Sequence, residues 1–464
     1  MLRRPWVTVL LSLALAGTLA SGSVAAPAAA PQVPDPYFPL DGNVGYDVRH
    51  YDIHDRYRFG DRRLSGVTKI RMVPTTDLTT FNLDLLLAVD DVEVDGRSAE
   101  FDKPNAHEVV VTPDAPLEPG EPVEVLVRYH GFPGRIGYLG ERNWLAGKHE
   151  VVAMNEPHMA PWWFPSNDHP SDKARFDIRI TTAKGREVIS NGVRKGRTVR
   201  GRSATTHWRM SDPMTTYLAF FAAGDFVIER GRAHGLSYYN AVSQRFGRSA
   251  TQQGLRALRR SAAITAWLQR ELGDYPFATT GGLVTSLPVS FALENQTRPT
   301  YPGAPSVGLL VHELAHQWFG DSVAVERWRD IWLNEGFASY MEVRHREARG
   351  GSSTSRWLHR TYRSYPASDG FWDLDIADPG PGRIFDGAVY TRGAMTLAAL
   401  RNRIGNADFR QLLRRWVSVN HDGNARVEDF TAMAETVSGE QLDEFFHAWL
   451  SSENRPPDTT AYGW

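Results

Sequence analysis

The spacing of apolar and polar side chains changes part-way along this chain, near residue 230. Before that point, several stretches alternate between the two kinds of side chain with a period of two, as in residues 123–129 and 176–181. This alternation is typical of half-buried strands in an antiparallel sheet. The pair Asn191-Gly192 predicts a tight turn between two strands. We therefore expect residues 35–230 to form a β-rich N-terminal domain.

After residue 230 the apolar positions follow a helical period. Arginines lie opposite an apolar stripe that consists of Leu255, Leu258, Ala262, Ala266 and Leu272. Further helices are expected over about 331–347, over about 388–403 and in two or three segments after Asp408, whereas the Gly/Pro-rich stretch 378–382 predicts a loop. A β-rich front half and a helical back half, residues 231–460, suggest two packed domains. A cleft between such domains is a favoured place for a small-ligand site.

Composition narrows the classes of function. With 464 residues the chain has room for two or three domains with full cores. Its formal net charge is −2 and no long run of one sign occurs. The sequence therefore lacks the cluster of basic residues that is typical of a nucleic-acid-binding protein. Cysteine is absent, which excludes disulfides, thiolate metal ligands and cysteine nucleophiles. A metal site built from histidine and carboxylate ligands fits that absence.

The first residues have the composition of an export signal. Arg3 and Arg4 give a positive start, an apolar stretch follows, and small residues after it offer cleavage sites. That stretch, of about fourteen residues, is too short to span a membrane comfortably. We expect residues 1–30 to be a cleaved signal peptide and the mature chain to be secreted without stable membrane insertion. An uncleaved anchor is the alternative, and the export route, general or twin-arginine, stays open.

The strongest chemical signal is the run His-Glu-Leu-Ala-His at residues 312–316. Residues four apart lie on one face of a helix, so His312 and His316 can offer ring nitrogens to one metal ion. Glu313 stands beside them, where its carboxylate can take a proton from metal-bound water. Glu335, on the next expected helix, completes a set of two histidines and one carboxylate. Such a set leaves a fourth position open, which is typical of a catalytic zinc ion rather than a structural one.

A surface helix with two solvated histidines would show the same motif, but the flanking positions argue against it. The helix is apolar around much of its circumference, with Val307, Leu310, Val311, Leu314, Ala315 and Trp318. Buried histidine and glutamate side chains are costly unless they are paired or bound to a metal. We therefore predict one zinc ion per chain, held by His312, His316 and Glu335, although cobalt or manganese would suit similar ligands.

A zinc ion with these ligands indicates hydrolysis. Zinc lowers the pKa of its bound water to about 7 and polarises a carbonyl oxygen. Glu313, next to that water, is the expected general base and can later pass the proton to a leaving nitrogen. The reaction is then amide-bond hydrolysis without a covalent intermediate.

The sequence on both sides of the metal motif extends the pattern. Residues 311–320 read Val-His-Glu-Leu-Ala-His-Gln-Trp-Phe-Gly, and residues 332–338 read Trp-Leu-Asn-Glu-Gly-Phe-Ala. Together they resemble the M1 family of zinc aminopeptidases, gluzincins of the aminopeptidase N type. In that family eighteen residues separate the second histidine from the ligand glutamate, and the gap between His316 and Glu335 is the same.

Two further segments carry the resemblance. Residues 291–295, Phe-Ala-Leu-Glu-Asn, are similar to the family's Gly-x-Met-Glu-Asn stretch along the substrate groove, with Phe291 and Leu293 as departures. There Glu294 corresponds to the glutamate that binds the free α-amine of the substrate, so that cutting follows the first residue. Tyr390, in Tyr-Thr-Arg-Gly-Ala, matches the family tyrosine whose hydroxyl donates a hydrogen bond to the oxyanion, with arginine for the family's lysine two residues later.

The resemblance also points to two less specific positions. Glu156, in an Asn-Glu-Pro run of the β-rich domain, lies where the family places a second glutamine or glutamate on the α-amine. Glu342, seven residues after Glu335 and on the same helical face, fits a position behind the metal ligands. A solvated acid is an equal alternative for Glu342.

The resemblance covers most of the chain and implies an α+β multidomain fold. A saddle-like antiparallel β domain would be followed by a thermolysin-like, mainly helical metallopeptidase domain, in a short form without the C-terminal helical domain of longer relatives. The leading hypothesis is a secreted, monomeric zinc aminopeptidase whose partners are peptides with a free N-terminus. Two alternatives stay open. One is a zinc endopeptidase, since the metal motif does not decide where cutting occurs, and the other is an inactive peptide-binding protein on the same fold.

Overall fold

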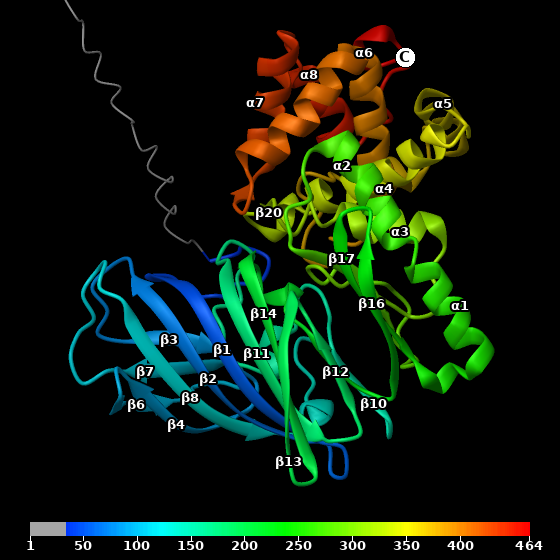
Figure 1. Ribbon diagram of the computed structural model, residues 1–464. Helices are drawn as coiled ribbons and strands as arrows, with labels where there is room; N and C mark the ends of the chain where they lie inside the picture. Colours follow the sequence, from blue (N-terminus) through cyan, green and yellow to red (C-terminus); the bar gives the residue numbers. More distant parts are fainter. Residues whose placement is uncertain (1–33) are drawn as a thin grey trace, which may run out of the picture. The chain divides into compact units, whose positions relative to one another are not determined.

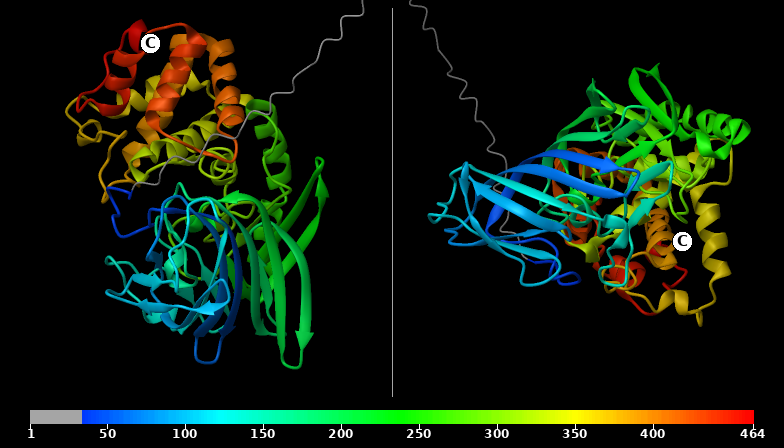
Figure 2. Two further views of the ribbon diagram at one scale, coloured as in Figure 1. Left: turned by 90° about the vertical axis from the view of Figure 1, so that its left-hand side faces the viewer. Right: turned by 90° about the horizontal axis from the view of Figure 1, so that it is seen from below.

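The strands of the N-terminal half form one large sheet and two small ones in a computed structural model that describes residues 34–464 (Figures 1 and 2). The described residues form a single compact unit. The predicted signal peptide, residues 1–30, lies outside the described residues and stays a prediction.

The large sheet has eight strands. They are β1 (Tyr46–Arg58), β2 (Arg63–Pro74), β4 (Ala88–Val94), β5 (Arg97–Ser98), β8 (Val123–Gly131), β11 (Ala174–Ala183), β13 (Val193–Arg200) and β14 (Ser203–Met214). Their order is β13-β14-β11-β1-β2-β8-β4-β5, and neighbours pair antiparallel except for β1 and β11, which run parallel. The two alternating stretches of the sequence lie in β8 and β11, as predicted, and Figure 1 shows β8 beside β2.

Two smaller sheets accompany it. The first has the order β12-β15-β10-β9, with β9 (Trp144–Ala146), β10 (Glu150–Ala153), β12 (Glu187–Ser190) and β15 (Phe221–Gly224). The second has the order β3-β7-β6, with β3 (Phe81–Asp84), β6 (Glu100–Asp102) and β7 (Glu108–Thr112). The predicted turn Asn191-Gly192 joins β12 to β13, and Gly192 has the positive φ of 71° that such a turn favours.

The prediction that the chain is helical from residue 230 onward is wrong in part, because a fourth sheet lies there. Its strands are β16 (Phe226–Ala233), β17 (Leu236–Ser243), β18 (Thr279–Val284) and β19 (Thr300–Tyr301), paired in that order. The last five residues of β17 and all of β18 are buried, so no alternation marks them as strands. The predicted domain boundary between residues 230 and 231 falls within β16, and the division into 35–230 and 231–460 stays a prediction.

Helices dominate the remainder. They are α1 (Arg248–Leu258), α2 (Ser261–Leu272), α3 (Val307–Ala315), α4 (Trp332–Ala348), α5 (Thr354–Ser364), α6 (Gly387–Val419), α7 (Val427–Ser438) and α8 (Asp443–Phe446). The helix expected over 388–403 is the first part of α6, which is interrupted at Gly405 (φ 84°). None of the helices in this described part is long and apolar enough to cross a membrane.

The single apolar stripe predicted over residues 255–272 is wrong in part, because the chain breaks between α1 and α2. Ala266 is only half-buried, whereas Ile264 and Trp267 face the core. The break at residues 259 and 260 shifts the phase of the second helix, so a stripe drawn through both helices misses its true buried face.

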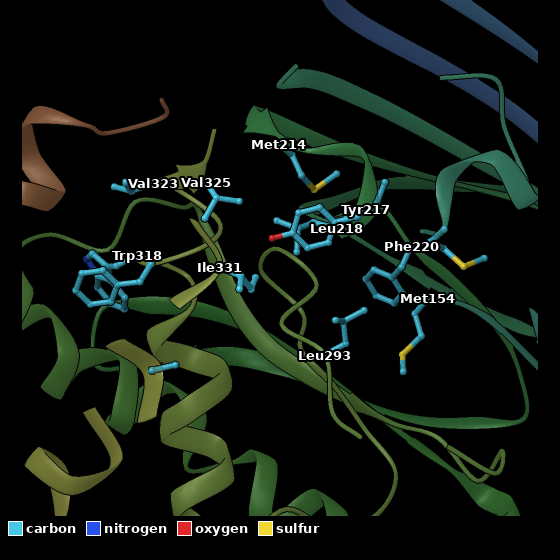
Figure 3. Close-up of a cluster of buried hydrophobic side chains, with 14 of the residues drawn as sticks. Met154, Met214, Tyr217, Leu218, Phe220, Leu293, Trp318, Val323, Val325 and Ile331 are labelled. Atoms are coloured by element: carbon cyan, nitrogen blue, oxygen red, sulfur yellow. The ribbon is translucent and has the colours of Figure 1, made fainter. Parts of the chain in front are cut away.

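A shared hydrophobic cluster fixes the segments that later supply the site. Figure 3 shows Met154, Leu293, Trp318 and Ile331 among its side chains, and each is at most 2% exposed. These four residues lie close in sequence to Glu156, Glu294, His316 and Glu335, respectively. Because packed interiors have few voids, this cluster holds four separate stretches of chain in a fixed register.

Helices α4 and α6 touch at two glycines. A Cβ added to Gly393 would lie 2.8 Å from the Cα of Gly336, and one added to Gly336 would lie 2.9 Å from the Cα of Gly393. Only two residues without side chains allow this approach, which lies one residue after Glu335 and three after Tyr390.

Replacement of Gly393 by alanine should therefore destabilise the protein. The new methyl group meets the backbone of α4, which must shift, and we expect a loss of about 1–3 kcal/mol in the free energy of unfolding, measured by urea denaturation. Gly387→Ala, in the same helix, is the matched control because nothing lies within 4 Å of its added Cβ. Equal stability of the two variants would contradict a close crossing of α4 and α6.

Candidate active site

Helix α3 carries the first part of the predicted motif. It begins after Ser306, whose hydroxyl accepts a hydrogen bond from the backbone N–H of Leu309 at 3.2 Å. His312 and Glu313 lie in the last turns of the helix, and His316 follows at its C-terminal end. All three side chains are buried, at 8%, 3% and 1% exposure.

Glu335, in the first turn of α4, meets both histidines. Its Oε2 lies 3.2 Å from His312 Nε2 and 3.4 Å from His316 Nε2. Burial would raise the pKa of the Glu335 carboxyl, but His316 and His312 outweigh that effect and lower the pKa to about 2. The three residues predicted as metal ligands are thus brought together, with one buried donor atom each.

The outer nitrogens of the two imidazoles are engaged elsewhere. His312 Nδ1 lies 3.1 Å from Glu342 Oε1, and His316 Nδ1 lies 3.0 Å from the backbone oxygen of Phe319, to which it can donate. A proton on Nδ1 leaves Nε2 free as a ligand, which is the usual arrangement at metal-binding histidines. Glu342 therefore lies behind His312 and is not a freely solvated acid.

This donor set fits zinc. Two imidazole nitrogens and one carboxylate oxygen are the donors of many catalytic zinc sites. With ligand bonds of about 2.0–2.2 Å, tetrahedral ligands lie about 3.4 Å from one another, and the two measured spacings, 3.2 and 3.4 Å, match that value.

Glu313 stands beside the ligands and is not one of the three donors. Burial raises the pKa of its carboxyl to about 8, against the effect of His312 and His316. A divalent cation bound beside it would lower that pKa again. A carboxylate that stands beside the ligand set without belonging to it suits acid–base chemistry.

Two more carboxylates approach from other segments. Glu294 is 2% exposed, while Glu156 comes from the β-rich half and is half-buried. Oxygens of Glu156, Glu294 and Glu335 all lie within 4.8 Å of one another. One carboxylate oxygen of Glu156 and one of Glu294 are buried without a hydrogen-bond partner in the described chain. Buried acceptors of this kind are normally satisfied by a cation, a hydrogen-bond donor or an ordered water.

A cavity of about 720 Å³ opens over these groups. It is lined by all seven predicted site residues and by Glu342, Phe291, Leu293 and others. Tyr390, near the start of α6, lies with its ring 6.0 Å from that of His312 and nearly parallel to it. Its phenol keeps its proton at neutral pH, because burial and the surrounding carboxylates raise its pKa.

The two departures from the expected pattern at 291–295 have different environments. Phe291 is 41% exposed on the wall of the cavity. Leu293 is buried, and its backbone exchanges two hydrogen bonds with Thr300, at 2.9 and 2.7 Å. The segment thus runs beside β19 despite the change of side chains.

Some positioning residues escaped prediction. Gln317, which follows the second histidine, donates to the backbone oxygen of Glu294 at 2.9 Å and accepts from the N–H of Thr297 at 2.7 Å. The turn at residues 191–192 contributes as well, since Asn191 donates to the oxygen of Gln296 at 3.0 Å. The sequence offered a hint only for Gln317, a polar residue within an apolar helix end.

Arg392, which stands where the resemblance expects lysine, anchors Tyr390. Its guanidinium is fully buried and donates to five backbone oxygens, those of Trp372, Leu374, Ala448, Trp449 and Ser452. The planar fork of arginine suits several acceptors at once better than an ammonium group does.

Comparison with known families settles the ancestry of this arrangement. The Peptidase family M1 domain matches residues 280–449, and the Peptidase M1 N-terminal domain matches residues 48–218. Together the two matches cover well over half of the chain. The chain belongs to peptidase family M1. Membership of this family of zinc metallopeptidases implies one zinc ion per chain, and the donor set described above fits it.

Two relatives among the aminopeptidases are longer than this chain. Aminopeptidase M1-C of Oryza sativa subsp. japonica is 25% identical over 355 residues, which cover 70% of this chain and 39% of that protein. Probable M1 family aminopeptidase 2 of Encephalitozoon cuniculi is 26% identical over 88% of this chain and 51% of its own length. The chain thus spans about two fifths to one half of these relatives.

Solved M1 structures share the whole described fold. The crystal structure of the M1 zinc metallopeptidase from Deinococcus radiodurans has a TM-score of 0.82 at 27% identity, covering 92% of this chain and 98% of that one. A mutant of the same enzyme bound to the substrate Tyr-Ser-Ala has a TM-score of 0.82 at 26% identity. The α+β fold predicted from the sequence, a β-rich part followed by a mainly helical catalytic part, is confirmed.

Loss of the Glu342 carboxylate should weaken zinc binding without removing a ligand. In Glu342→Gln the imidazole of His312 loses its charged partner, so we expect zinc affinity to fall by about 10- to 100-fold. Competition with a chromophoric chelator measures it. Glu347→Gln, on the same helix but paired with Arg344 and Arg401, is the control and should keep wild-type affinity. Unchanged affinity in Glu342→Gln would show that this carboxylate does not support His312.

Proposed function

We propose that this chain is a secreted, zinc-dependent aminopeptidase that removes the N-terminal residue from peptides. The proposal rests above all on Glu156 and Glu294. Each has a buried carboxylate oxygen without a hydrogen-bond partner in the described chain, and each brings an oxygen within 4.8 Å of one of Glu335. The α-ammonium of a peptide carries three N–H donors and a positive charge, so it suits two such acceptors. An ammonium bound beside the Glu335 carboxylate would bring the first peptide bond to the metal ligands, which directs cleavage to that bond.

The chemistry divides among the side chains that line the cavity. A zinc ion bound by His312, His316 and Glu335 would supply a Lewis acid that polarises the scissile carbonyl and acidifies water. Glu313 accepts the proton of the attacking water and passes it to the leaving nitrogen. A buried carboxylate beside two imidazoles suits this transfer.

Tyr390 stabilises charge on the reacting oxygen. Its hydroxyl, protonated at neutral pH, donates a hydrogen bond to the negative charge that develops on the carbonyl oxygen as water attacks. A donor of this kind contributes about 3–4 kcal/mol to transition-state stabilisation in comparable sites. The anchoring of its helix by Arg392 keeps the donor in place.

The substrates are peptides with a free N-terminus. The M1 zinc metallopeptidase of Deinococcus radiodurans, whose fold this chain shares, has been crystallised as a mutant with Tyr-Ser-Ala. A zinc endopeptidase would not need the two amine-binding acids, and an inactive peptide-binding protein would need neither Glu313 nor Tyr390. The chain acts as a monomer in this proposal.

Secretion rests on the composition of residues 1–30. The small residues 23–25, Ser-Val-Ala, and 28–30, Ala-Ala-Ala, are the expected cleavage sites. N-terminal sequencing of protein recovered from the medium should therefore give a sequence that begins after residue 25 or residue 30. A chain that retains Met1 and stays with the cells would contradict export.

Replacement of Glu313 by glutamine should abolish the proton transfer while the metal remains bound. We expect kcat on aminoacyl anilides to fall by about 10²- to 10⁴-fold, with wild-type zinc content by elemental analysis. A zinc-loaded variant with the kcat of the wild type would contradict the role of Glu313 as the general base.

The free amine of the substrate decides between exopeptidase and endopeptidase. Glu294→Gln removes a charge-assisted hydrogen bond, so kcat/KM for a free peptide should fall by about 10- to 150-fold. In the same assay, wild-type enzyme should release the first residue of the free peptide and leave its N-acetylated twin intact. If the N-acetylated peptide is cleaved as readily as the free peptide, the aminopeptidase assignment is wrong and the zinc endopeptidase becomes the better hypothesis.

A further inference from the structure

A second cluster of potential metal ligands lies in the β-rich half and shares no residue with the active-site cavity. Asp84 ends β3 and Glu108 begins β7, and the two face each other directly in the antiparallel pair. His107 precedes Glu108 in the chain. The exposed fractions of the three residues are 0%, 7% and 1%, and one donor atom from each lies within 4.8 Å of the others. Two buried carboxylates opposite each other on adjacent strands are destabilising unless a cation joins them.

The distances inside this cluster suit a metal ion better than hydrogen bonds. His107 Nδ1 lies 3.6 Å from Asp84 Oδ1 and 3.6 Å from Glu108 Oε1. Hydrogen bonds from a ring nitrogen to oxygen span about 2.7–3.2 Å, so neither contact qualifies. Ligands around one ion with bonds of about 2.0–2.2 Å lie about 3.4 Å apart. The ligand atoms of the catalytic site show nearly the same spacing, 3.2 and 3.4 Å.

Polar atoms of the cluster are left without partners. Neither ring nitrogen of His107 makes a hydrogen bond within the described chain, and the same holds for Glu108 Oε2. The imidazole is held in place by the ring of Tyr138, stacked at 4.7 Å. Its Nε2 points to Asp41 Oδ1 at 3.4 Å, on the other side of the ring from Asp84 and Glu108. At metal-binding histidines one ring nitrogen binds the ion and the other faces a carboxylate or a backbone oxygen. His107 has the same arrangement, with Nδ1 toward Asp84 and Glu108 and Nε2 toward Asp41.

Asp84 is fixed by its own hydrogen bonds. Its carboxylate accepts from the N–H of Gly42 at 3.1 Å, the side-chain amide of Asn43 at 3.1 Å and the N–H of Asp168 at 2.6 Å. These donors hold Oδ1 in place toward His107. The residue therefore behaves as a pre-oriented ligand, which lowers the entropy cost of binding an ion.

The charge of the cluster is unbalanced. Four buried acids, Asp41, Asp84, Glu108 and Asp168, surround the imidazole of His107, and each is at most 7% exposed. His158, paired with Asp41 at 2.6 Å, offsets part of that charge. The ammonium of Lys103 lies near Glu108 but donates to the backbone oxygen of Leu85.

We propose that Asp84, His107 and Glu108 bind a second divalent metal ion, Zn²⁺ or Mn²⁺, with a structural role. One imidazole and two carboxylates are donors that both ions accept. The ion would join the ends of β3 and β7 and neutralise their facing acids. The site is built from residues that the proposed peptidase reaction does not use, so it stands or falls independently of that reaction.

Metal stoichiometry of the full chain tests this proposal. The protein is expressed in medium with Zn²⁺ and Mn²⁺, purified without chelators and assayed by elemental analysis. Wild type should hold two ions per chain, and both His107→Gln and Glu108→Gln should hold one and melt at a lower temperature. His130→Gln, which removes a half-exposed histidine paired with Asp90 at 2.8 Å, is the matched control and should keep two.

The outcomes separate a metal site from a network of shared protons. One ion per chain in the wild type overturns the proposal, whether or not the variants fold. Two ions in the wild type that persist in the folded His107→Gln or Glu108→Gln variant also overturn it, because the second ion then binds elsewhere. Loss of one ion in either folded variant, with two retained in His130→Gln, supports the site.

Discussion

The approach of two imidazoles to one buried carboxylate is the constraint on which this structure depends. His312, His316 and Glu335 bring their donor atoms to 3.2 and 3.4 Å in a setting almost free of solvent. Side chains of this kind are costly to bury and would not stay together without compensation. A divalent ion supplies that compensation. The packing of the surrounding helices and loops holds its three ligands in position.

Several elements of the fold position these side chains. Helix α3 fixes the two histidines, α4 brings Glu335, and the contact of Gly336 with Gly393 lets α6 pass close enough to present Tyr390. Outer contacts from Glu342 and from the oxygen of Phe319 orient the rings. The β-rich half adds Glu156 to the same cavity. Glu156 and Glu294 thus come from two separate parts of the chain and depend on the core that these parts share.

Local patterns explain why much of the site could be predicted from the sequence. His312, Glu313 and His316 follow from helical spacing, and Glu335 lies in the next α-helix along the chain, nineteen residues after His316. The placement of Glu156 depends on tertiary packing, so only a resemblance could suggest it. Gln317 and Arg392 act through backbone oxygens of distant residues, which no spacing reveals. Asp84, His107 and Glu108 meet through the pairing of β3 with β7 and for that reason form no motif along the chain.

The strands that could be predicted from the sequence are those with one buried and one exposed face. Strands β8 and β11 alternate because each has one buried face, and both were predicted. β17 and β18 are buried on both faces over most of their length, which removed the signal and made this region look helical. The phase change between α1 and α2 depends on two residues at a break, and an apolar stripe cannot show it.

Anomalous diffraction at the zinc absorption edge tests the central claim most directly. Crystals of the full chain, grown without added metal or chelator, should give a peak about 2.0–2.2 Å from His312 Nε2, His316 Nε2 and a carboxylate oxygen of Glu335. No peak among these atoms, or a Glu335 side chain turned away from the two histidines, would contradict the account.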